Sequence, residues 1–508
     1  MADTNSELSQ LLSSAAVVFL GTVVGSASML IERVLVGRAL DPSAYGEISI
    51  GLAILSFGSI ISMAGFAQGV PRYMPRFDAE ADKRGVWLTG IGVTGLVSVV
   101  VTGVFLLNLE TLDALLLDGE EGVRLLRLFV LSIPFVAGLR VTVGAIRGFE
   151  HTMYKTYVKD LLYPGGRILL LWVLLEAGIG IYAAGYAYLA SAIASLVAAH
   201  LLLRRLLPLV GRFRTYAREM TAFSAPLVVS TTLMLLLTKT DTVMLGYFQP
   251  SREVGLYGAA YPLANGLLLA HAAFGFLYLP LASRLDSTDE RDEIESIYTV
   301  TTKWIYLVTF PAFVAFVAFP EDVVTLFFGD RYALAAPALA VLTFGFFTNA
   351  AVGRNRETLS ALGKTTPILA ANLFAFICNL GLNLLLIPRY GFVGAAYASA
   401  ISFITLNAVV YATLKLKFDI TPLSDETLRT FVVPPAIVVP TALLLSRWTE
   451  LTAVTLPVFL VSVGLLSLGL TGVVGGLQSE DGVILELVED ALGVRVPVVR
   501  RYIPDDDR

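Results

Sequence analysis

Cysteine and histidine are almost absent from this chain of 508 residues. The single cysteine, Cys378, excludes an internal disulfide and a multi-cysteine metal site. The three histidines, His151, His200 and His271, have no spacing that links them to a serine–aspartate pair or to other metal ligands. We therefore expect no catalytic residues, no metal site and no cofactor.

Charge is also scarce. Charged residues make up 15% of the chain, whereas a soluble globular domain has about 25%. Hydrophobic residues make up 56%, and the mean hydropathy is +0.75. This composition predicts an integral membrane protein with little soluble mass and no nucleic-acid partner.

Lysine is the rarer basic residue, with 8 Lys against 28 Arg, and the net charge is −5. Hydrophilic segments such as 286–295 and 505–507 are rich in aspartate and glutamate. Strong net charge keeps a protein soluble, so an acidic, lysine-poor surface indicates a high-salt organism.

Apolar runs predict an all-α integral membrane fold of about 14 transmembrane helices. A bilayer requires about 20 apolar residues per helix, and most of the runs reach that length. The predicted spans are 11–36, 48–70, 86–108, 123–146, 160–178, 180–203, 222–247, 255–283, 300–320, 333–353, 365–387, 391–414, 431–447 and 454–476.

Lysine and arginine in the loops predict the orientation of these spans. If the N-terminus is cytoplasmic, 25 of these residues fall in inside segments and 7 in outside segments. Cytoplasmic loops carry the excess of basic residues. We therefore expect a multi-pass protein of the cytoplasmic membrane, with both termini in the cytoplasm.

Four glycine landmarks of the first half return in the second half at offsets of 209 to 215 residues. The pairs are Gly37 and Gly246, Gly46 and Gly255, Gly148 and Gly363, and Gly180 and Gly391. Chance similarity among glycine- and alanine-rich helices is the alternative explanation. Because the offset spans six helices, an even number, it predicts a parallel repeat about an axis along the membrane normal.

The repeat predicts the domain organisation. Two six-helix lobes, residues 1–210 and 211–418, would enclose a central cavity. Two extra C-terminal helices would occupy 419–476, and residues 477–508 would form an acidic cytoplasmic tail.

Six charged residues are predicted to lie within the membrane, where each costs about 2.5–3.5 kcal/mol on insertion scales. They are Glu32, Arg33, Arg140, Arg167, Lys239 and Asp241. Such residues predict a polar interior. The seventh helix is the repeat mate of the first, so the charges on these two helices should face each other.

Two interpretations of these charges remain open. Glu32 with Arg33, or Lys239 with Asp241, could form neutralising pairs that only fix helix packing. Residues one or two positions apart do not share a helix face, which favours a cavity role for Arg33, Lys239 and Arg140. Arg167 follows a Pro-Gly-Gly turn, where freed backbone carbonyls could satisfy it. A cationic cavity suits a phosphate or diphosphate headgroup, because arginine donates a forked pair of hydrogen bonds.

Several motifs together resemble the polysaccharide-transporter (Wzx-like) branch of the multidrug/oligosaccharidyl-lipid/polysaccharide (MOP) exporter superfamily. The resemblance covers roughly residues 11–415. The motifs are Val36–Leu40 with Tyr45-Gly46, Asp241–Gly246 with Val254–Tyr257, Ala361–Lys364, and Asn379–Pro388 with Tyr390–Ala396.

The resemblance implies a flippase that moves a lipid-linked oligosaccharide between leaflets by alternating access of two lobes. It also implies that basic cavity residues, here Arg33, Arg38 and Lys239, hold the phosphate or diphosphate. Fourteen helices are closer to the MurJ lipid II flippases than to twelve-helix Wzx proteins. The lysine-poor, acidic surface is similar to that of haloarchaeal relatives, where the carrier lipid would be of the dolichol type.

The partners expected from the resemblance are a lipid-linked oligosaccharide, membrane lipids, and glycosyltransferases or an oligosaccharyltransferase of the same pathway. We expect a monomer. The main alternative is a MATE-like antiporter in which Glu32 or Asp241 is the ion-coupling carboxylate. The second alternative is a membrane glycosyltransferase. Such an enzyme would need a sizeable extracytoplasmic loop with catalytic carboxylates, and the longest predicted outside loop, 108–122, is short.

Overall fold

The structure is a computed structural model that describes residues 25, 27–117, 122–288 and 290–482. Every regular element in these ranges is a helix, which confirms the all-α prediction. The chain forms two compact units. The first unit consists of Met1–Ala259 and Asn383–Ala395, and the second of Ala260–Leu382 and Ala396–Arg508. The predicted tail beyond residue 482 lies outside the described residues.

The first unit begins with a helix over residues 27–39. The elements that follow are α2 (Pro42–Met63), α3 (Phe66–Tyr73), η1 (Met74–Arg76), α4 (Glu80–Leu107), α5 (Leu109–Leu116), α6 (Gly122–Gly148), α7 (Thr152–Lys155), the π-helix η2 (Thr156–Leu162), α8 (Tyr163–Glu176), α9 (Tyr182–Leu206), α10 (Ala217–Phe248) and the start of α11 (Ser251–Asn265).

The second unit holds the remaining elements. They are α12 (Leu268–Ser287), α13 (Arg291–Ala318), α14 (Pro320–Phe328), η3 (Asp330–Ala335), α15 (Ala336–Ala351), α16 (Asn355–Ala361), most of α17 (Thr365–Phe418), α18 (Asp425–Leu445) and α19 (Thr455–Val473).

Ten helical segments of the described chain are long and apolar enough to cross a membrane. One of them, Thr365–Phe418, contains two predicted spans, 365–387 and 391–414. Gly391, with φ 55° and ψ −137°, is not helical and separates them. The ten segments overlap eleven of the predicted spans. The predicted spans 160–178 and 255–283 are not among them, and most of the predicted span 11–36 lies outside the described residues, so the number fourteen is not confirmed.

The sequence explains the ends of α2. Asp41 accepts hydrogen bonds from the backbone N–H groups of Ser43 at 2.8 Å and Ala44 at 3.2 Å, and Pro42 opens the first turn. Both features stabilise a helix start. Ala64 and Gly65 then adopt positive φ values of 47° and 78°, which ends α2 and redirects the chain into α3.

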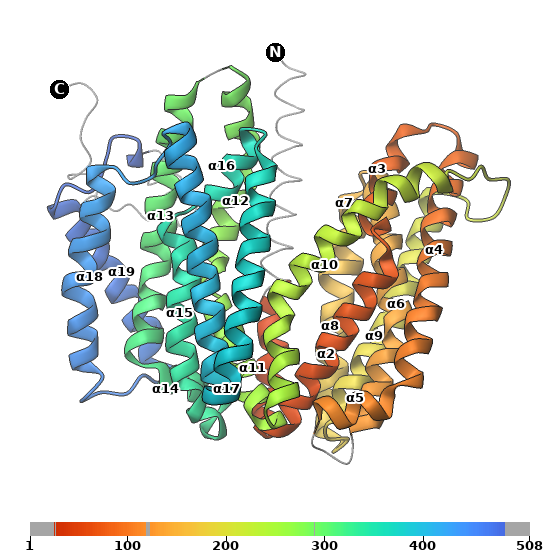
Figure 1. The fold of residues 1–508 in the computed structure, drawn as a ribbon, viewed down its shortest axis with the longest axis horizontal. Coiled ribbons are helices and arrows are strands. Elements are labelled where there is room, and N and C mark those ends of the chain that lie inside the picture. Colours follow the sequence, from red (N-terminus) through yellow and green to blue (C-terminus); the bar gives the residue numbers. More distant parts are fainter. Residues whose placement is uncertain (1–24, 26, 118–121, 289, 483–508) are drawn as a thin grey trace. The chain divides into compact units, whose positions relative to one another are not determined.

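Helix α6 lies at the centre of the first unit, in contact with α2, α3, α4 and α9 (Figure 1). Its side chains Phe129 and Ile133 are fully buried. They occupy the space left by Gly51 and Gly58 on α2, where an added Cβ atom would overlap them. Small residues let two membrane helices approach closely, so these glycines fix the α2–α6 contact.

The start of α2 also meets the start of α11 at very short range, through two glycines that the repeat pairs. A Cβ atom on Gly46 would overlap the carbonyl oxygen of Ser251, and one on Gly255 would overlap that of Pro42. Ser251 and Pro42 are themselves 209 positions apart, as are the two glycines. The contact is therefore reciprocal, as in a surface that packs on its own copy about a twofold axis.

A second repeat-related pair shares a conformation. Gly180 and Gly391 have positive φ values of 66° and 55°, which glycine adopts without strain. At Gly391 the turn docks on α11, because the N–H of Phe392 donates to Glu253 Oε2 at 3.1 Å. Gln249 Nε2 donates to the carbonyl of Ile387 at 2.9 Å and holds the same turn. These bonds explain why residues 383–395 belong to the first unit.

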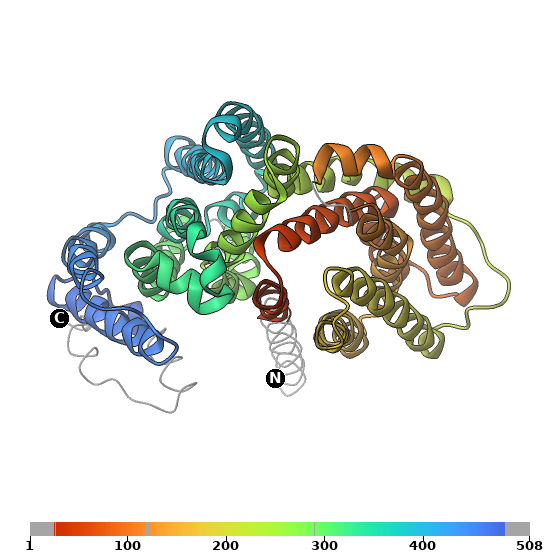
Figure 2. The same ribbon diagram turned by 90° about the horizontal axis from the view of Figure 1, so that it is seen from below.

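In the second unit α13 contacts α12, α15, α18 and α19, and Figures 1 and 2 show the blue α18–α19 pair beside it. Tyr306 on α13 stacks on Phe431 of α18 with ring centroids 4.0 Å apart. Phe313 stacks on Phe347 of α15 at 4.1 Å. The predicted extra helices thus pack directly on the aromatic side chains of α13.

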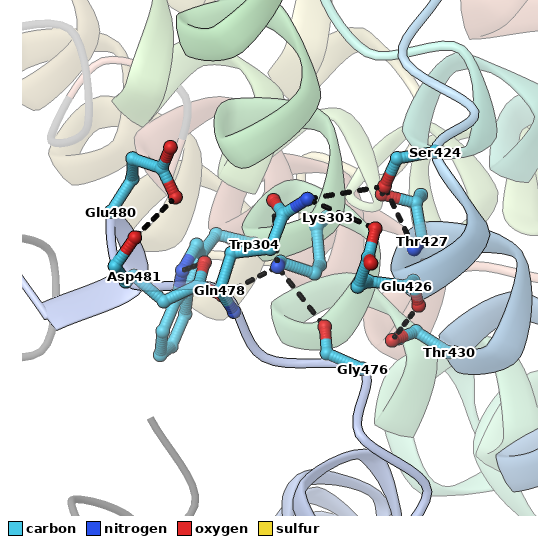
Figure 3. Close-up of polar contacts among 11 residues, drawn as sticks. Lys303, Trp304, Ser424, Glu426, Thr427, Thr430, Gly476, Gln478, Glu480 and Asp481 are labelled. Atoms are coloured by element: carbon cyan, nitrogen blue, oxygen red, sulfur yellow. Dashed lines mark hydrogen bonds and ion pairs between the residues drawn. The ribbon is translucent and has the colours of Figure 1, made fainter. Parts of the chain in front are cut away.

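The chain after α19 returns to α13 through a buried ion pair (Figure 3). Lys303 and Asp481 are both fully buried and in contact. Lys303 Nζ also donates to the carbonyl of Gly476 at 3.1 Å, and Trp304 Nε1 donates to Asp481 Oδ1 at 2.8 Å. Gln478 Nε2 continues the network to Glu426 at 3.1 Å. Residues 477–482, which the sequence assigns to the tail, are therefore anchored in the second unit.

We predict that Gly46→Ala and Gly255→Ala each destabilise the protein. The methyl group would overlap backbone that cannot rotate away, and overpacking of this kind costs about 1–3 kcal/mol. The measurement is thermal unfolding of the purified protein in detergent. Gly95→Ala is the matched control, because no atom lies within 4 Å of an added Cβ atom there. Equal melting temperatures for all three variants and the parent would contradict the reciprocal contact.

Candidate functional site

Glu32 lies in the helix over residues 27–39, and its carboxylate is 2% exposed. Tyr188 of α9 donates its hydroxyl hydrogen to Glu32 Oε1 at 2.5 Å. Arg167 of α8 forms an ion pair with Glu32 Oε2, also at 2.5 Å. The carboxylate is thus held by one neutral donor and one cation from two different helices.

Aromatic rings cover the cation of this pair. The Arg167 guanidinium lies 4.4 Å from the ring centroid of Tyr188 and 5.0 Å from that of Tyr163. Phe129 of α6 meets Tyr188 edge to face at 5.6 Å. Cation–π contacts stabilise a cation that has left water, so this pocket fixes Arg167 as well as Glu32. The sequence left the partner of Arg167 open, and the structure shows that the partner is the carboxylate of Glu32.

Arg33, the next residue, faces elsewhere. It is half-buried and interacts with the hydroxyl of Tyr45 on α2, and it lies within electrostatic range of Tyr188 and Glu32. Lys239 of α10 is also half-buried, and Arg33 is its charged neighbour. Arg33 of the first predicted helix and Lys239 of the seventh thus lie within electrostatic range of each other, and their role in a shared cavity stays a prediction.

Asp241 turns the other way from Lys239 and is 1% exposed. Tyr257 of α11 donates to its Oδ2 at 2.7 Å, and Asn383 of α17 donates to its Oδ1 at 2.6 Å. Residues two positions apart on a helix do not share a face, which explains why Lys239 and Asp241 have separate surroundings. These three residues all belong to the first unit.

Glu32 and Asp241 are separated by 209 positions, the same offset as the reciprocal glycines. Each is a buried carboxylate that accepts a hydrogen bond from a tyrosine. Their further partners differ, since Arg167 holds Glu32 whereas the neutral amide of Asn383 holds Asp241. The two carboxylates thus share a repeat position and differ in the side chains described as their partners.

The other two predicted cavity residues have exposed side chains. Arg38 follows Arg33 by five positions near the end of the same helix. Arg140 lies on α6 within electrostatic range of Lys159. Their exposure does not show whether a ligand binds either residue, so their role in a cavity stays a prediction.

Sequence reasoning did not single out Tyr188, Tyr257 or Asn383, which hold the two carboxylates. The sequence did contain a signal for them, because each is a polar side chain within a predicted span. A buried polar group inside a membrane needs a hydrogen-bond partner, and the buried carboxylates were available as partners. Among the described residues, no group of three or more histidine, cysteine, aspartate or glutamate side chains could hold a metal ion.

Comparison with known proteins identifies the family of this chain. The family model for polysaccharide biosynthesis proteins matches residues 35–337, which is more than half of the chain. The chain belongs to this family. It is 24% identical over 402 residues to the probable low-salt glycan biosynthesis flippase Agl15 of Haloferax volcanii, covering 78% of this chain and 82% of that protein. It is 25% identical over 195 residues to an uncharacterized membrane protein of Methanocaldococcus jannaschii, MJ1068, covering 37% and 38%.

Two solved structures show the fold of this polysaccharide biosynthesis protein. The lipid II flippase MurJ in an inward closed conformation has a TM-score of 0.66 at 13% identity, covering 90% of this chain and 98% of its own. An inward-facing MATE multidrug transporter of the MOP superfamily has a TM-score of 0.65 at 17% identity, covering 77% and 94%. The resemblance to the Wzx-like branch of that superfamily is confirmed, and the chain is a multi-pass membrane protein.

We predict that Arg167→Gln destabilises the protein strongly. It leaves the Glu32 carboxylate buried without its cation, and removal of one partner of a buried ion pair costs about 3–5 kcal/mol. The double variant Glu32→Gln/Arg167→Gln removes both charges and is expected to recover part of that loss. Thermal unfolding of the four proteins in detergent completes the double-mutant cycle.

The control for this cycle is Arg218→Gln, which removes an exposed arginine of α10. It is expected to leave the melting temperature unchanged. If the Glu32 and Arg167 effects simply add, the two side chains are not coupled, and the ion pair described above does not stabilise the fold.

Proposed function

We propose that this protein is a flippase that moves a lipid-linked glycan across the cytoplasmic membrane, for surface polysaccharide assembly or protein glycosylation. The glycan would be carried on a polyprenyl or dolichyl phosphate or diphosphate. Family membership supports a role in polysaccharide biosynthesis. The similarity to Agl15, named a probable low-salt glycan biosynthesis flippase, supports a flippase in that role.

The observation that carries the proposal is the approach of Arg33 and Lys239. The charges predicted to lie in the membrane are four cations, Arg33, Arg140, Arg167 and Lys239, and two carboxylates, Glu32 and Asp241, which leaves two positive charges in excess. Arg167 is paired with Glu32. Arg33 and Lys239, which lie within electrostatic range of each other, then supply cations suited to the phosphorylated head of a lipid.

The mechanism we propose is alternating access of the two homologous lobes. The polar head of the lipid would bind Arg33 and Lys239, with Arg38 as a further phosphate contact, while the apolar tail remains in the bilayer. Rocking of one lobe against the other about a fixed site is the general mode of such repeat transporters. Both termini would be cytoplasmic, and the enzymes that build and use the glycan would be its partners in the pathway.

The MATE fold keeps a second candidate open, a cation-coupled antiporter in which Glu32 or Asp241 is the coupling carboxylate. The ion pair to Arg167 argues against Glu32, because a carboxylate that already binds an arginine is a poor acceptor for a proton or sodium ion. Asp241, which accepts hydrogen bonds from Tyr257 and Asn383, is the stronger candidate of the two.

We predict that deletion of the gene causes a complete lipid-linked oligosaccharide to accumulate on the cytoplasmic face. Without translocation the lipid is assembled and then not delivered. Extraction and mass spectrometry of lipid-linked sugars, with glycan accessibility in sealed vesicles, measure the product and its side. Truncated sugars would indicate a biosynthetic enzyme instead, and unchanged lipid-linked sugars with altered drug sensitivity would indicate the antiporter.

We also predict that Arg33→Ala and Lys239→Ala each lower transport without loss of protein from the membrane. Hydrogen bonds to charged groups contribute about 1.5–3 kcal/mol, which corresponds to a roughly ten- to hundredfold effect. Complementation of the deletion strain measures the transport, and immunoblotting measures the protein. Arg218→Ala is the control, because that arginine is exposed at the start of α10. Normal transport by both single variants and the double variant would remove this site assignment.

A further inference from the structure

An apolar groove runs between the η2–α8 segment and α9, which lie side by side in the first unit (Figure 1). Its volume is about 540 Å³. Tyr157, Leu161 and Leu162 line one end and Leu169 continues the same wall, and all four are strongly exposed. Gly165 and Gly166 form its floor, where no side chain fills the space.

Positive charge collects beside this groove. Lys159 of η2 lies within electrostatic range of Lys155, Arg140 and Arg147, and the one carboxylate in that set is Asp160. Asp160 is paired with Lys155 at 3.4 Å. Four cations and one carboxylate leave a local charge of +3. Like charges in proximity repel, so such a cluster is stabilised by a bound anion.

The cluster and the groove are continuous along the chain. Lys159 lies in the π-helix η2 between Val158 and Leu161, which both line the groove. The lysine therefore belongs to the same segment as the groove wall. Arg147, at the end of α6, lies on the side of the membrane that the loop charges predict to be cytoplasmic.

We propose that this groove and its cations form a docking site for an isoprenoid lipid phosphate, with the chain in the groove and the phosphate at the cluster formed by Arg140, Arg147, Lys155 and Lys159. This proposal rests on the flippase function proposed above and names where the lipid carrier is first held. The local charge of +3 matches a carrier monophosphate without its glycan, or a diphosphate carrier, each with about two negative charges. It matches a phosphodiester, such as a membrane phospholipid, less well, because a phosphodiester carries one. The geometry assigns Arg140 to this cluster rather than to the central cavity.

The test is binding of farnesyl phosphate to the purified full chain in nanodiscs, measured by native mass spectrometry, with farnesol and phosphatidylglycerol as comparison ligands. Farnesyl phosphate is expected to bind more tightly than either. Equal binding of farnesol would overturn the role of the cations. Equal binding of phosphatidylglycerol would mean that the surface takes bulk anionic lipid and would overturn the assignment to the carrier.

Two variants separate the groove from the cluster. Gly165→Leu fills the groove where no atom lies within 4 Å of an added Cβ atom, and it is expected to abolish binding. Gly95→Leu, on an equally open glycine of α4, is its control. Arg147→Gln/Lys159→Gln removes two charges, each worth about 1 kcal/mol near a membrane surface, so binding is expected to fall roughly thirtyfold. Arg218→Gln is the control for that variant.

Unchanged binding in Gly165→Leu or in the double charge variant overturns the docking site. This readout is independent of transport. A deletion strain with no change in lipid-linked sugars would refute the proposed function even if farnesyl phosphate binds, whereas loss of transport with unchanged binding in these variants would refute the docking site alone.

Discussion

A membrane interior offers no water to a charged side chain, so each buried charge requires a partner from the protein itself. In the first unit this requirement determines which helices must be neighbours. Glu32 needs α8 and α9, because Arg167 and Tyr188 hold it. Asp241 needs α11 and α17, because Tyr257 and Asn383 hold it. The carboxylates thus tie together helices that are far apart in the sequence, while the glycines of α2 permit the close contacts of α2 with α6 and α11.

The two carboxylates meet this requirement through different partners. They stand 209 residues apart, and each accepts a hydrogen bond from a tyrosine. Arg167 pairs with Glu32, whereas the side-chain amide of Asn383 donates to Asp241. Each carboxylate thus joins residues of three helices within the first unit.

Sequence reasoning predicted the helices well, because long apolar runs have one explanation in a membrane. The repeat was also accessible, since Gly46 and Gly255 stand at one offset and meet in the structure. Partners were harder to predict. Arg167 and Glu32 are separated by 135 positions, and nothing local to either residue identifies the other. The burial of Lys303 against Asp481 was missed for the same reason, because Lys303 lies at the start of the predicted span 300–320 and Asp481 lies 178 positions away in the predicted tail.

The proximity of Arg33 to Lys239 is the feature on which the proposed binding site rests. Like charges repel, and a bound anion offsets that repulsion. In the proposed mechanism the phosphorylated head of the lipid is that anion. Its binding would then couple the arrival of substrate to the conformation of the lobe.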